Sequence, residues 1–330
     1  MYQLIQNFPQ QLKESIELTA SWVVRPHLFP IHQIVICGMG GSGIGGDFVA
    51  AMMKTEGKVP VIVNKTYQLP GFVNQHTLVV VSSYSGNTEE SLMILDQALK
   101  TSCKLVCISS GGKMMEKAVA NQLDFLKLPS GIPSPRACLG YSVTAQLTVL
   151  KALDLAPSGV MDQIRASADL ISFEQEETMQ LAEKISGQIF NKHLIIYCSD
   201  RIEPVAIRCR QQINENSKLL CWHHVFPEMN HNELVGWTGN LDKIAVIFFK
   251  NKDDQKQNLR RMQLTQEIIQ PYAEIILEIF SKGHSLTEKM IYLTHLSDWI
   301  SWYVAEKRGV DASEIKVIDY LKSSLENPAY

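Results

Sequence analysis

Small hydroxyl side chains cluster directly after an apolar stretch that has the composition of a buried strand. Leu78–Val81 are apolar, Ser83, Ser85 and Thr88 follow, and a helical pattern starts at Glu89. The first turn of a helix has unpaired N–H groups and a partial positive charge. Hydroxyl groups beside such a turn can bind a phosphate without a metal ion or a lysine, so the sequence predicts an anion site here. The alternative is an ordinary helix that these side chains cap.

A second segment of the same kind lies earlier in the chain and is rich in glycine. The strand-like run Gln33–Cys37 is followed by Gly38–Asp47, which contains six glycines, and Phe48 continues as a helix. We expect the glycine segment to be a loop between the two. Glycine allows positive φ and a close approach to the main chain, so this loop can also contact a ligand.

The glycine loop also matches the dinucleotide-binding fingerprint, through Gly38, Gly40 and Gly43. That fingerprint requires an acidic residue at the end of the next strand, where it binds the ribose. The next strand ends in Asn64 and Lys65 instead. The sequence therefore disfavours a dinucleotide-dependent oxidoreductase.

Two further residues could handle developing charge and protons. Arg136 lies in a segment stiffened by Pro133 and Pro135, and its planar guanidinium group suits anionic oxygens, with an ordinary surface arginine as the alternative. Glu215 lies near the end of a predicted helix that also contains Arg208 on the same face. The negative end of the helix dipole favours the protonated carboxyl there and makes the carboxylate a better base, whereas the plain alternative is a solvated glutamate.

Histidines gather between residues 223 and 231 without the spacing of a metal site. His223 and His224 are neighbours on a predicted strand and point to opposite faces, and no His-x-x-x-His pair is present, so no metal is expected. His231 lies between Asn230 and Asn232 in a predicted loop. A histidine there suits proton transfer, because its ordinary pKa is close to neutrality.

The composition is that of a two-domain enzyme. The chain has 330 residues, 45% of them hydrophobic and 20% charged, with a net charge of −3 that gives no reason to expect nucleic acid or a membrane as a partner. Seven cysteines without a Cys-x-x-Cys pair favour reduced thiols, and we expect Cys37, Cys107, Cys198 and Cys221 to fill the core. Without a signal-type N-terminus or a membrane-length apolar run, the expected location is the cytoplasm.

Strand-like and helical segments alternate in both halves of the chain, which predicts an α/β fold with parallel sheets and sites at the carboxyl ends of the strands. We place the domain junction near residue 153, within a helical stretch over 142–188, which gives domains of residues 1–152 and 153–330. A long helix over 285–307 has an apolar stripe, interpreted as core or as a dimer seam. A tail containing Lys322 follows it.

Several short motifs, taken in order, resemble the sugar isomerase (SIS) domain family, and more closely the bifunctional phosphoglucose/phosphomannose isomerases. They are the glycine-rich loop at 38–46, Ser-Ser-Tyr-Ser-Gly-Asn-Thr-Glu-Glu at 82–90, Ser-Pro-Arg at 134–136, Asn-Glu-Asn-Ser-Lys at 214–218, Asn-His-Asn-Glu at 230–233 and Ile-Asp-Tyr-Leu-Lys at 318–322. The resemblance covers nearly the whole chain. It implies two tandem SIS domains, each a flavodoxin-like parallel sheet flanked by helices, with the phosphate-binding loops in the first.

The resemblance also implies roles for individual residues. Five would bind the phosphate of a sugar phosphate: Gly41, Ser42, Ser83, Ser85 and Thr88. Glu215 would move a proton between C1 and C2, Arg136 would stabilise the enediolate oxygens, and His231 and Lys322 would assist ring opening. The histidine would come from the neighbouring subunit of a homodimer, and no cofactor is needed.

We therefore expect reversible isomerisation of glucose 6-phosphate and fructose 6-phosphate through a cis-enediolate, with mannose 6-phosphate as a second aldose. The alternative is a regulator that binds sugar phosphates through SIS domains without turnover. Retained Glu215, Arg136 and Lys322 argue against a regulator.

Overall fold

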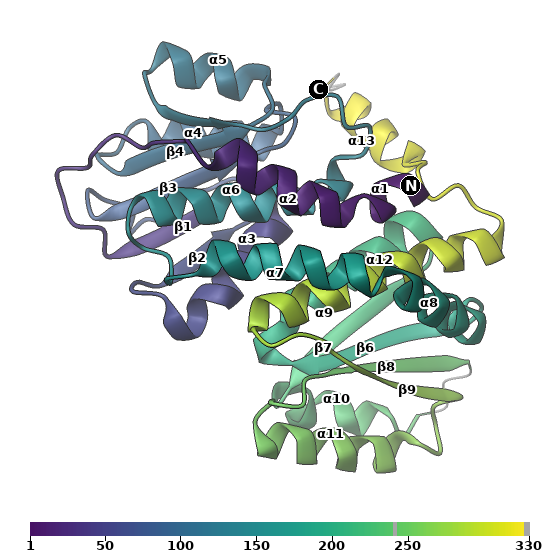
Figure 1. The fold of residues 1–330 in the computed structure, drawn as a ribbon. Coiled ribbons are helices and arrows are strands. Elements are labelled where there is room, and N and C mark those ends of the chain that lie inside the picture. The colour runs from purple at the N-terminus through teal and green to yellow at the C-terminus, as the bar shows by residue number, and fades with distance from the viewer. Residues whose placement is uncertain (240–242, 327–330) are drawn as a thin grey trace. The chain divides into compact units, whose positions relative to one another are not determined.

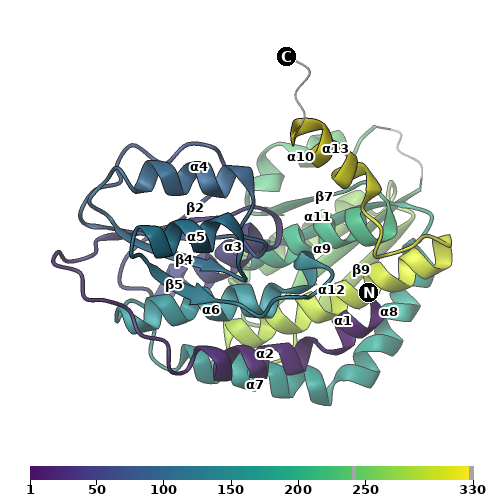
Figure 2. The same ribbon diagram turned by 90° about the horizontal axis from the view of Figure 1, so that it is seen from above.

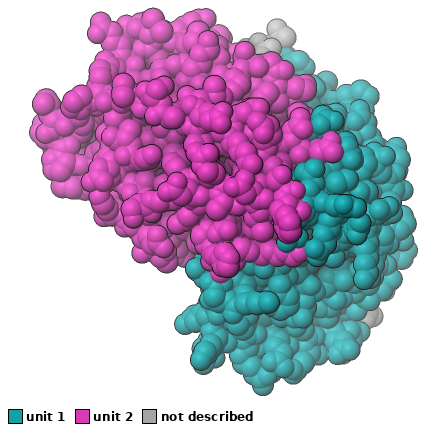
Figure 3. All heavy atoms as spheres, in the orientation of Figure 1, with its two compact units in different colours: residues 1–3, 174–281, 293–330 teal, residues 4–173, 282–292 magenta. Residues whose placement is uncertain are grey.

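The structure, a computed structural model, describes residues 1–239 and 243–326. The chain forms two compact units (Figure 3): unit 1 comprises residues 1–3, 174–281 and 293–330, and unit 2 comprises residues 4–173 and 282–292. The predicted junction near residue 153 falls at the end of helix α6 (Leu139–Ala152). A domain boundary at that point stays a prediction.

A five-stranded parallel sheet lies at the centre of unit 2 (Figure 1). Its order, β2-β1-β3-β4-β5, is the flavodoxin-like order that we expected. The strands are β1 (Gln33–Cys37), β2 (Val61–Asn64), β3 (Thr77–Ser82), β4 (Lys104–Ser109) and β5 (Asp124–Lys127). Strands β3 and β4 are buried along their whole length, as the apolar runs of a covered parallel sheet require.

Helices cover both faces of this sheet. The α-helices that lie wholly in unit 2 are α2 (Phe8–Thr19), α3 (Gly40–Glu56), α4 (Glu89–Ala98), α5 (Gly112–Ala120), α6 and α7 (Val160–Phe173). Residues of α4 and α5 form one hydrophobic cluster with the strands, through Leu95, Met114 and Val79 among others. Helix α2 packs along α6 and α7 (Figure 2), and the Ser15 hydroxyl on α2 donates to the Thr144 hydroxyl on α6 at 2.8 Å.

The register of the sheet brings the ends of its central strands level. Cys37 at the end of β1 pairs with Val81, and Ser82 at the end of β3 pairs with Ile108 on β4. The segments after β1 and β3 therefore leave the sheet at the same edge, which is where ligands bind in open α/β sheets.

Unit 1 is built around a second parallel sheet, with four strands in the order β7-β6-β8-β9. The strands are β6 (His193–Ser199), β7 (Cys221–Phe226), β8 (Ile244–Lys250) and β9 (Ile275–Phe280), and the helices are α8 (Gln175–Ile189), α9 (Glu203–Ser217), α10 (Glu233–Gly236), α11 (Lys256–Ile269) and α13 (Lys316–Glu326). Phe226, Phe248 and Met262 belong to one core cluster between the sheet and α11. The order repeats that of the first four strands of unit 2, so the two-domain α/β prediction is confirmed.

The long helix predicted over 285–307 is α12 (Leu286–Arg308). Met290, Leu293, Leu296 and Ile300 of its apolar stripe are fully buried within the chain, so these four are core residues. None of the helices in the described part of the chain is both long and apolar enough to span a membrane.

Candidate active site

The glycine-rich segment is mostly the first turns of a helix and not the loop that we expected. Helix α3 begins at Gly40, which has a positive φ of 49°, and Gly41 and Ser42 lie in its first turn. Packing against α6 requires a glycine within this helix: a Cβ atom on Gly45 would lie 2.3 Å from the Ser142 hydroxyl. Close helix packing thus outweighs the low helix propensity of glycine.

The start of α3 has the features of an anion site. Its first turn contains no acidic residue, and Met39, at the N-cap, makes no side-chain hydrogen bond to the helix. The positive end of the helix dipole is therefore not compensated by a carboxylate of the same turn. Backbone groups at such a position can bind a phosphate or a carboxylate.

The hydroxyl groups after β3 bond to one another and to their own loop. The Ser83 and Thr88 hydroxyls lie 2.8 Å apart, and Gly86 N–H donates to Ser83 Oγ at 3.2 Å. Thr88 is the N-cap residue of α4, yet its side chain makes no capping bond to that helix. These contacts disfavour the alternative of an ordinary capped helix. Ser85 is exposed, and its Oγ accepts from Asn87 N–H at 3.2 Å.

The hydroxyl loop is held against the next strand and helix. Gly86 has a φ of 70°, and a Cβ atom there would lie 1.8 Å from Gly111 O, so only glycine fits. Its carbonyl oxygen accepts from Met114 N–H at 2.9 Å. The loop therefore has a fixed backbone from which Ser85 projects.

Five of the six predicted unit 2 residues are brought together by these turns and their neighbours. A Cβ atom on Gly38 would lie 2.8 Å from Ser82 O, so the start of α3 passes beside the end of β3. A Cβ atom on Gly41 would lie 3.1 Å from Pro135 O, which places the segment of Arg136 beside α3 as well. Ser42, Ser83 and Thr88 lie in the same two turns, whereas Ser85 is the exposed member of the set.

Arg136 itself is 7% exposed, within a 3-10 turn over Pro135–Ala137. The Tyr84 hydroxyl accepts a hydrogen bond from Ile132 N–H at 3.2 Å, which ties the hydroxyl loop to the segment leading to Arg136. Burial raises the pKa of Tyr84, so its hydroxyl stays protonated. The arginine and the hydroxyl loop are therefore linked through the backbone of the same unit.

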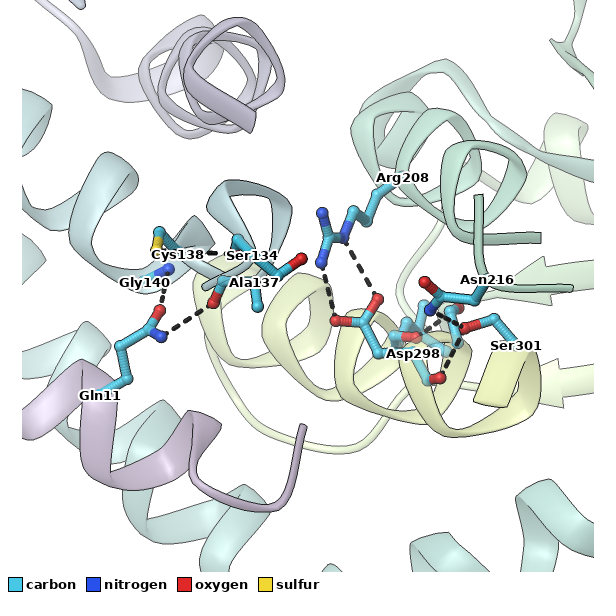
Figure 4. Close-up of polar contacts among 11 residues, drawn as sticks. Gln11, Ser134, Ala137, Cys138, Gly140, Arg208, Asn216, Asp298 and Ser301 are labelled. Carbon is cyan, nitrogen blue, oxygen red and sulfur yellow. Dashed lines mark hydrogen bonds and ion pairs between the residues drawn. The ribbon is translucent and has the colours of Figure 1, made fainter. Parts of the chain in front are cut away.

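Glu215 lies in unit 1, in the last turn of α9, as predicted, and is half-buried. The expected common face with Arg208 follows from their seven-residue spacing on this helix, but Arg208 is buried against α12. Its guanidinium group donates to Asp298 from Nε at 3.2 Å and from Nη2 at 3.0 Å (Figure 4). Glu215 is thus the half-buried acid at the end of a helix whose inner face is occupied by a buried ion pair.

His231 and Lys322 are exposed residues of unit 1, the first in a 3-10 turn over Glu228–His231 and the second on α13. The turn of His231 is followed by α10, whose Glu233 accepts a hydrogen bond from the Tyr197 hydroxyl. Trp237 N–H donates to the same tyrosine oxygen at 2.9 Å. The histidine is therefore carried by a segment anchored on β6, while Lys322 has no comparable anchor among the hydrogen bonds described.

One supporting residue near the predicted site was missed from the sequence. Gln146, on α6, donates from Nε2 to Ser42 O at 3.2 Å and to the Ser142 hydroxyl at 3.1 Å. It therefore stabilises the first turn of α3 from the side of α6. The only sequence signal was the four-residue spacing of Ser142 and Gln146 within a predicted helix.

The cysteines and the possible metal ligands are further candidates for chemistry. The four cysteines expected in the core, Cys37, Cys107, Cys198 and Cys221, are all buried and free. Burial raises the pKa of Cys37 and of Cys107 to about 12, so they are poor nucleophiles. Within residues 1–239 and 243–326, no group of three histidine, cysteine, aspartate or glutamate side chains could hold a metal ion.

Comparison with protein families assigns both halves of the chain. The SIS domain family matches residues 27–155, and the bacterial phospho-glucose isomerase C-terminal SIS domain matches residues 174–325. The first match contains the glycine-rich helix start, the hydroxyl loop and Arg136. The second contains Glu215, His231 and Lys322.

Curated relatives match over nearly the full length. A bifunctional phosphoglucose/phosphomannose isomerase from Caldicellulosiruptor bescii is 36% identical over 98% of this chain and 98% of its own length. One from Aquifex aeolicus is 33% identical over 92% of this chain and 93% of its own. A D-glucosamine-6-phosphate 4-epimerase from Sulfolobus acidocaldarius is 28% identical over 92% of each.

Solved structures share the fold at low sequence identity. The C-terminal domain of glucosamine-fructose-6-phosphate aminotransferase from Francisella tularensis has a TM-score of 0.75 at 15% identity, covering 95% of this chain and 98% of that one. Tagatose-6-phosphate ketose/aldose isomerase from Escherichia coli has a TM-score of 0.65 at 13% identity, covering 95% and 94%. These similarities show two SIS-type sheets in one chain.

Proposed function

Because the chain belongs to the bifunctional phosphoglucose/phosphomannose isomerase family, and is therefore an isomerase, we propose that it interconverts glucose 6-phosphate and fructose 6-phosphate, with mannose 6-phosphate as a second aldose substrate. The observation that carries this proposal is the strand edge of unit 2. There, an acid-free helix start lies beside a loop of bonded hydroxyl groups. Such an edge suits a dianionic phosphate.

The phosphate of the sugar is bound by the start of α3, through Gly41 and Ser42, and by the hydroxyls of Ser83, Ser85 and Thr88. The carrier of negative charge thus meets N–H groups, hydroxyls and the positive end of a helix dipole. Fixing one end of the substrate orients its first two carbons, so a single carboxylate is sufficient for the proton transfer.

Glu215 is the base of the reaction. Its carboxylate takes the proton from C2 of the open-chain aldose, the electron pair of that C–H bond forms the C1–C2 double bond, and the C1 carbonyl oxygen becomes an enediolate oxygen. The proton of the C2 hydroxyl passes to O1, and the protonated Glu215 returns its proton to C1 as the C2 carbonyl forms, which gives the ketose. Arg136 stabilises the negative charge that develops on the two oxygens. During ring opening, His231 and Lys322 transfer protons from the C1 hydroxyl and to the ring oxygen.

The test of this mechanism is a coupled assay on the wild type and on Glu215→Gln. The glutamine keeps the shape of the side chain and removes the base, so we expect kcat to fall by about 10² to 10⁴-fold, the usual contribution of a general base. KM for fructose 6-phosphate stays close to the wild-type value, because the phosphate contacts are unchanged. Wild-type kcat in the variant would remove Glu215 from the mechanism.

The choice of sugar is tested by measuring glucose, mannose and glucosamine 6-phosphates side by side. The amino sugar is included because the Sulfolobus acidocaldarius relative is named a D-glucosamine-6-phosphate 4-epimerase. We expect turnover of the first two and none of the third. The reverse pattern would assign the chain to amino-sugar chemistry.

We also propose a cytoplasmic homodimer in which each subunit supplies His231 to the site of the other. The exposed position of His231 on its turn is compatible with such an arrangement. Co-expression of Glu215→Gln with His231→Ala tests it. If His231 acts across the dimer, mixed dimers contain one site with both residues intact and regain activity. If His231 acts within its own subunit, both sites stay defective.

A further inference from the structure

The two residues that follow Glu215 are fixed to α12. Asn216 Nδ2 donates to the Ser301 hydroxyl at 2.9 Å, and the Ser217 hydroxyl donates to the Ser301 carbonyl oxygen at 2.7 Å. Figure 4 shows Asn216 pointing from α9 to Ser301 on α12. Two consecutive residues of α9, Asn216 and Ser217, thus bond to the side chain and to the main chain of Ser301.

The hydroxyl of Ser301 is used in both directions. It donates its hydrogen to the carbonyl oxygen of Asp298 at 2.7 Å and accepts from Asn216 with a lone pair. Asn216 and Ser301 are both fully buried. Because both residues are shielded from water, loss of one partner removes a hydrogen bond that water cannot replace without rearrangement.

The end of α9 is fixed from the other side as well. Lys218 has a left-handed φ of 56°, and its ammonium group donates to the carbonyl oxygens of Glu215 and Asp311, each at 2.7 Å. Arg308 Nε donates to the Ser217 carbonyl oxygen at 3.0 Å. The backbone that follows Glu215 therefore has little freedom to rotate or slide, although the helix ends two residues after it.

We propose that Asn216 and Ser301 are positioning residues for the base: their hydrogen bond sets the rotation of the last turn of α9, and through it the place of the Glu215 carboxylate. The inference rests on the proposed role of Glu215. A base must lie within hydrogen-bonding reach of the proton that it removes. A displacement of about 1 Å can lower the rate by about a hundredfold.

Ser301→Ala tests the inference by removing the acceptor of the Asn216 bond while leaving the carbonyl contact of Ser217. We expect kcat to fall by about 10- to 100-fold, while KM for fructose 6-phosphate is unchanged. Ser301→Thr retains a hydroxyl and restores kcat. Ser186→Ala is the matched control, because Ser186 is an equally buried helical serine whose hydroxyl, among the residues that the structure describes, bonds only to the carbonyl of Glu183 on the same helix. We expect its kcat to stay at the wild-type value.

Asn216→Ala removes the same bond from the other side, so a folding failure of one variant still leaves the other to be measured. If the two residues act through one bond, Asn216→Ala and the double variant both lose as much kcat as Ser301→Ala alone. The inference would be overturned by any of three results. They are a wild-type kcat in either folded single variant, losses in kcat that multiply in the double variant, and a rise in KM in place of the fall in kcat. A fully active Glu215→Gln would reject the proposed function itself. An inactive Glu215→Gln beside a fully active Ser301→Ala would reject only the positioning role.

Discussion

The two sheets share one strand order but carry different chemistry at their carboxyl edges. In unit 2, the segments after β1 and β3 supply glycines, main-chain amides and hydroxyls. In unit 1, the corresponding strand β6 ends in Ser199 and is followed by Asp200, and β8 is followed by Asn251-Lys252-Asp253-Asp254. The helix after β6, α9, also has an acid, Glu203, in its first turn, whereas α3 has none.

Unit 1 fills its edge with an anion of its own. The carboxylate of Asp254, buried at 5% exposure, accepts from the Ser199 hydroxyl at 3.1 Å and from Asn251 N–H and Asn251 Nδ2 at 3.0 Å each. The same topological position thus holds a built-in carboxylate in one unit and a candidate phosphate site in the other. Topology decides where an anion can lie, and the local side chains decide whether that anion is internal or a ligand.

The largest effect is expected when the edge of unit 2 is given a carboxylate like that of unit 1, with Ser85→Asp. An aspartate can still accept the bond from Asn87 N–H, so the turn is retained. Its negative charge opposes the phosphate, and we expect KM for fructose 6-phosphate to rise by about 100-fold, close to 3 kcal/mol of lost binding. Steady-state kinetics at low salt measure it.

Ser85→Asn is the matched control, since it has the shape and the turn bond of the aspartate without the charge. We expect its KM to rise far less than that of the aspartate variant, because the variant loses one hydroxyl contact but adds no negative charge. An equal rise in both variants would mean that the charge is irrelevant, and a normal KM in Ser85→Asp would place the phosphate away from this loop.

The fold could be predicted to a large extent because each strand is a short apolar run and each edge segment is polar. The run Leu78–Val81 before Ser83 gave both the position of β3 and the edge at which it ends. The start of α3 could not be predicted, because glycine disfavours helices locally. One reason for glycine inside this helix is the close packing of Gly45 against Ser142 on α6, about a hundred residues away in the sequence.

The elements that carry the proposed site residues could be predicted, but the contacts that support them could not. Gly41, Ser42, Ser83 and Thr88 lie where the motifs placed them, in neighbouring turns. Their support by Gln146, and the buried pairing of Arg208 with Asp298, join residues 90 or more positions apart. Local spacing contains no information on such pairs, which depend on how the helices pack.

The two units are expected to differ in how their stability changes at acidic pH, as one buried titratable group in each illustrates. Burial lowers the pKa of His295, in α12 of unit 1, to about 3, so this histidine is neutral when folded and gains a proton on unfolding below pH 6.5. The contribution of neutral His295 to the free energy of unfolding is complete above pH 6.5 and declines as the pH falls. The decline is about 1.36 kcal/mol per pH unit, which gives about 2 kcal/mol at pH 5. Unit 2 contains Asp124, whose pKa is lowered because hydrogen bonds from Lys104 and Arg25 outweigh its burial. That contribution is lost only below pH 3.8.

We therefore expect unit 1 to lose stability between pH 7 and pH 5 while unit 2 keeps the contribution of Asp124. Urea unfolding followed by tryptophan fluorescence detects this, because Trp222, Trp237, Trp299 and Trp302 lie in unit 1 and only Trp22 lies in unit 2. His295→Gln keeps an acceptor for the Trp299 N–H, which bonds His295 Nε2 at 3.2 Å, and does not titrate. The loss between pH 7 and pH 5 should be smaller in this variant, and an unchanged loss would assign the effect to other groups.

The smallest effect is expected from neutralising the anion of unit 1, with Asp254→Asn. An amide can replace only one of the two carboxylate oxygens, so one of the donors from Ser199 and Asn251 loses its acceptor. We expect a loss of about 1.5 kcal/mol in the free energy of unfolding, the lower end for hydrogen bonds to a charged group, with KM for fructose 6-phosphate unchanged. Asp253→Asn is the control, because Asp253 is 48% exposed and pairs with Arg201 at 3.2 Å, and exposed pairs contribute little. If Asp254→Asn were neutral, or if it altered KM, the carboxylate would not be the internal counterpart of the ligand's phosphate.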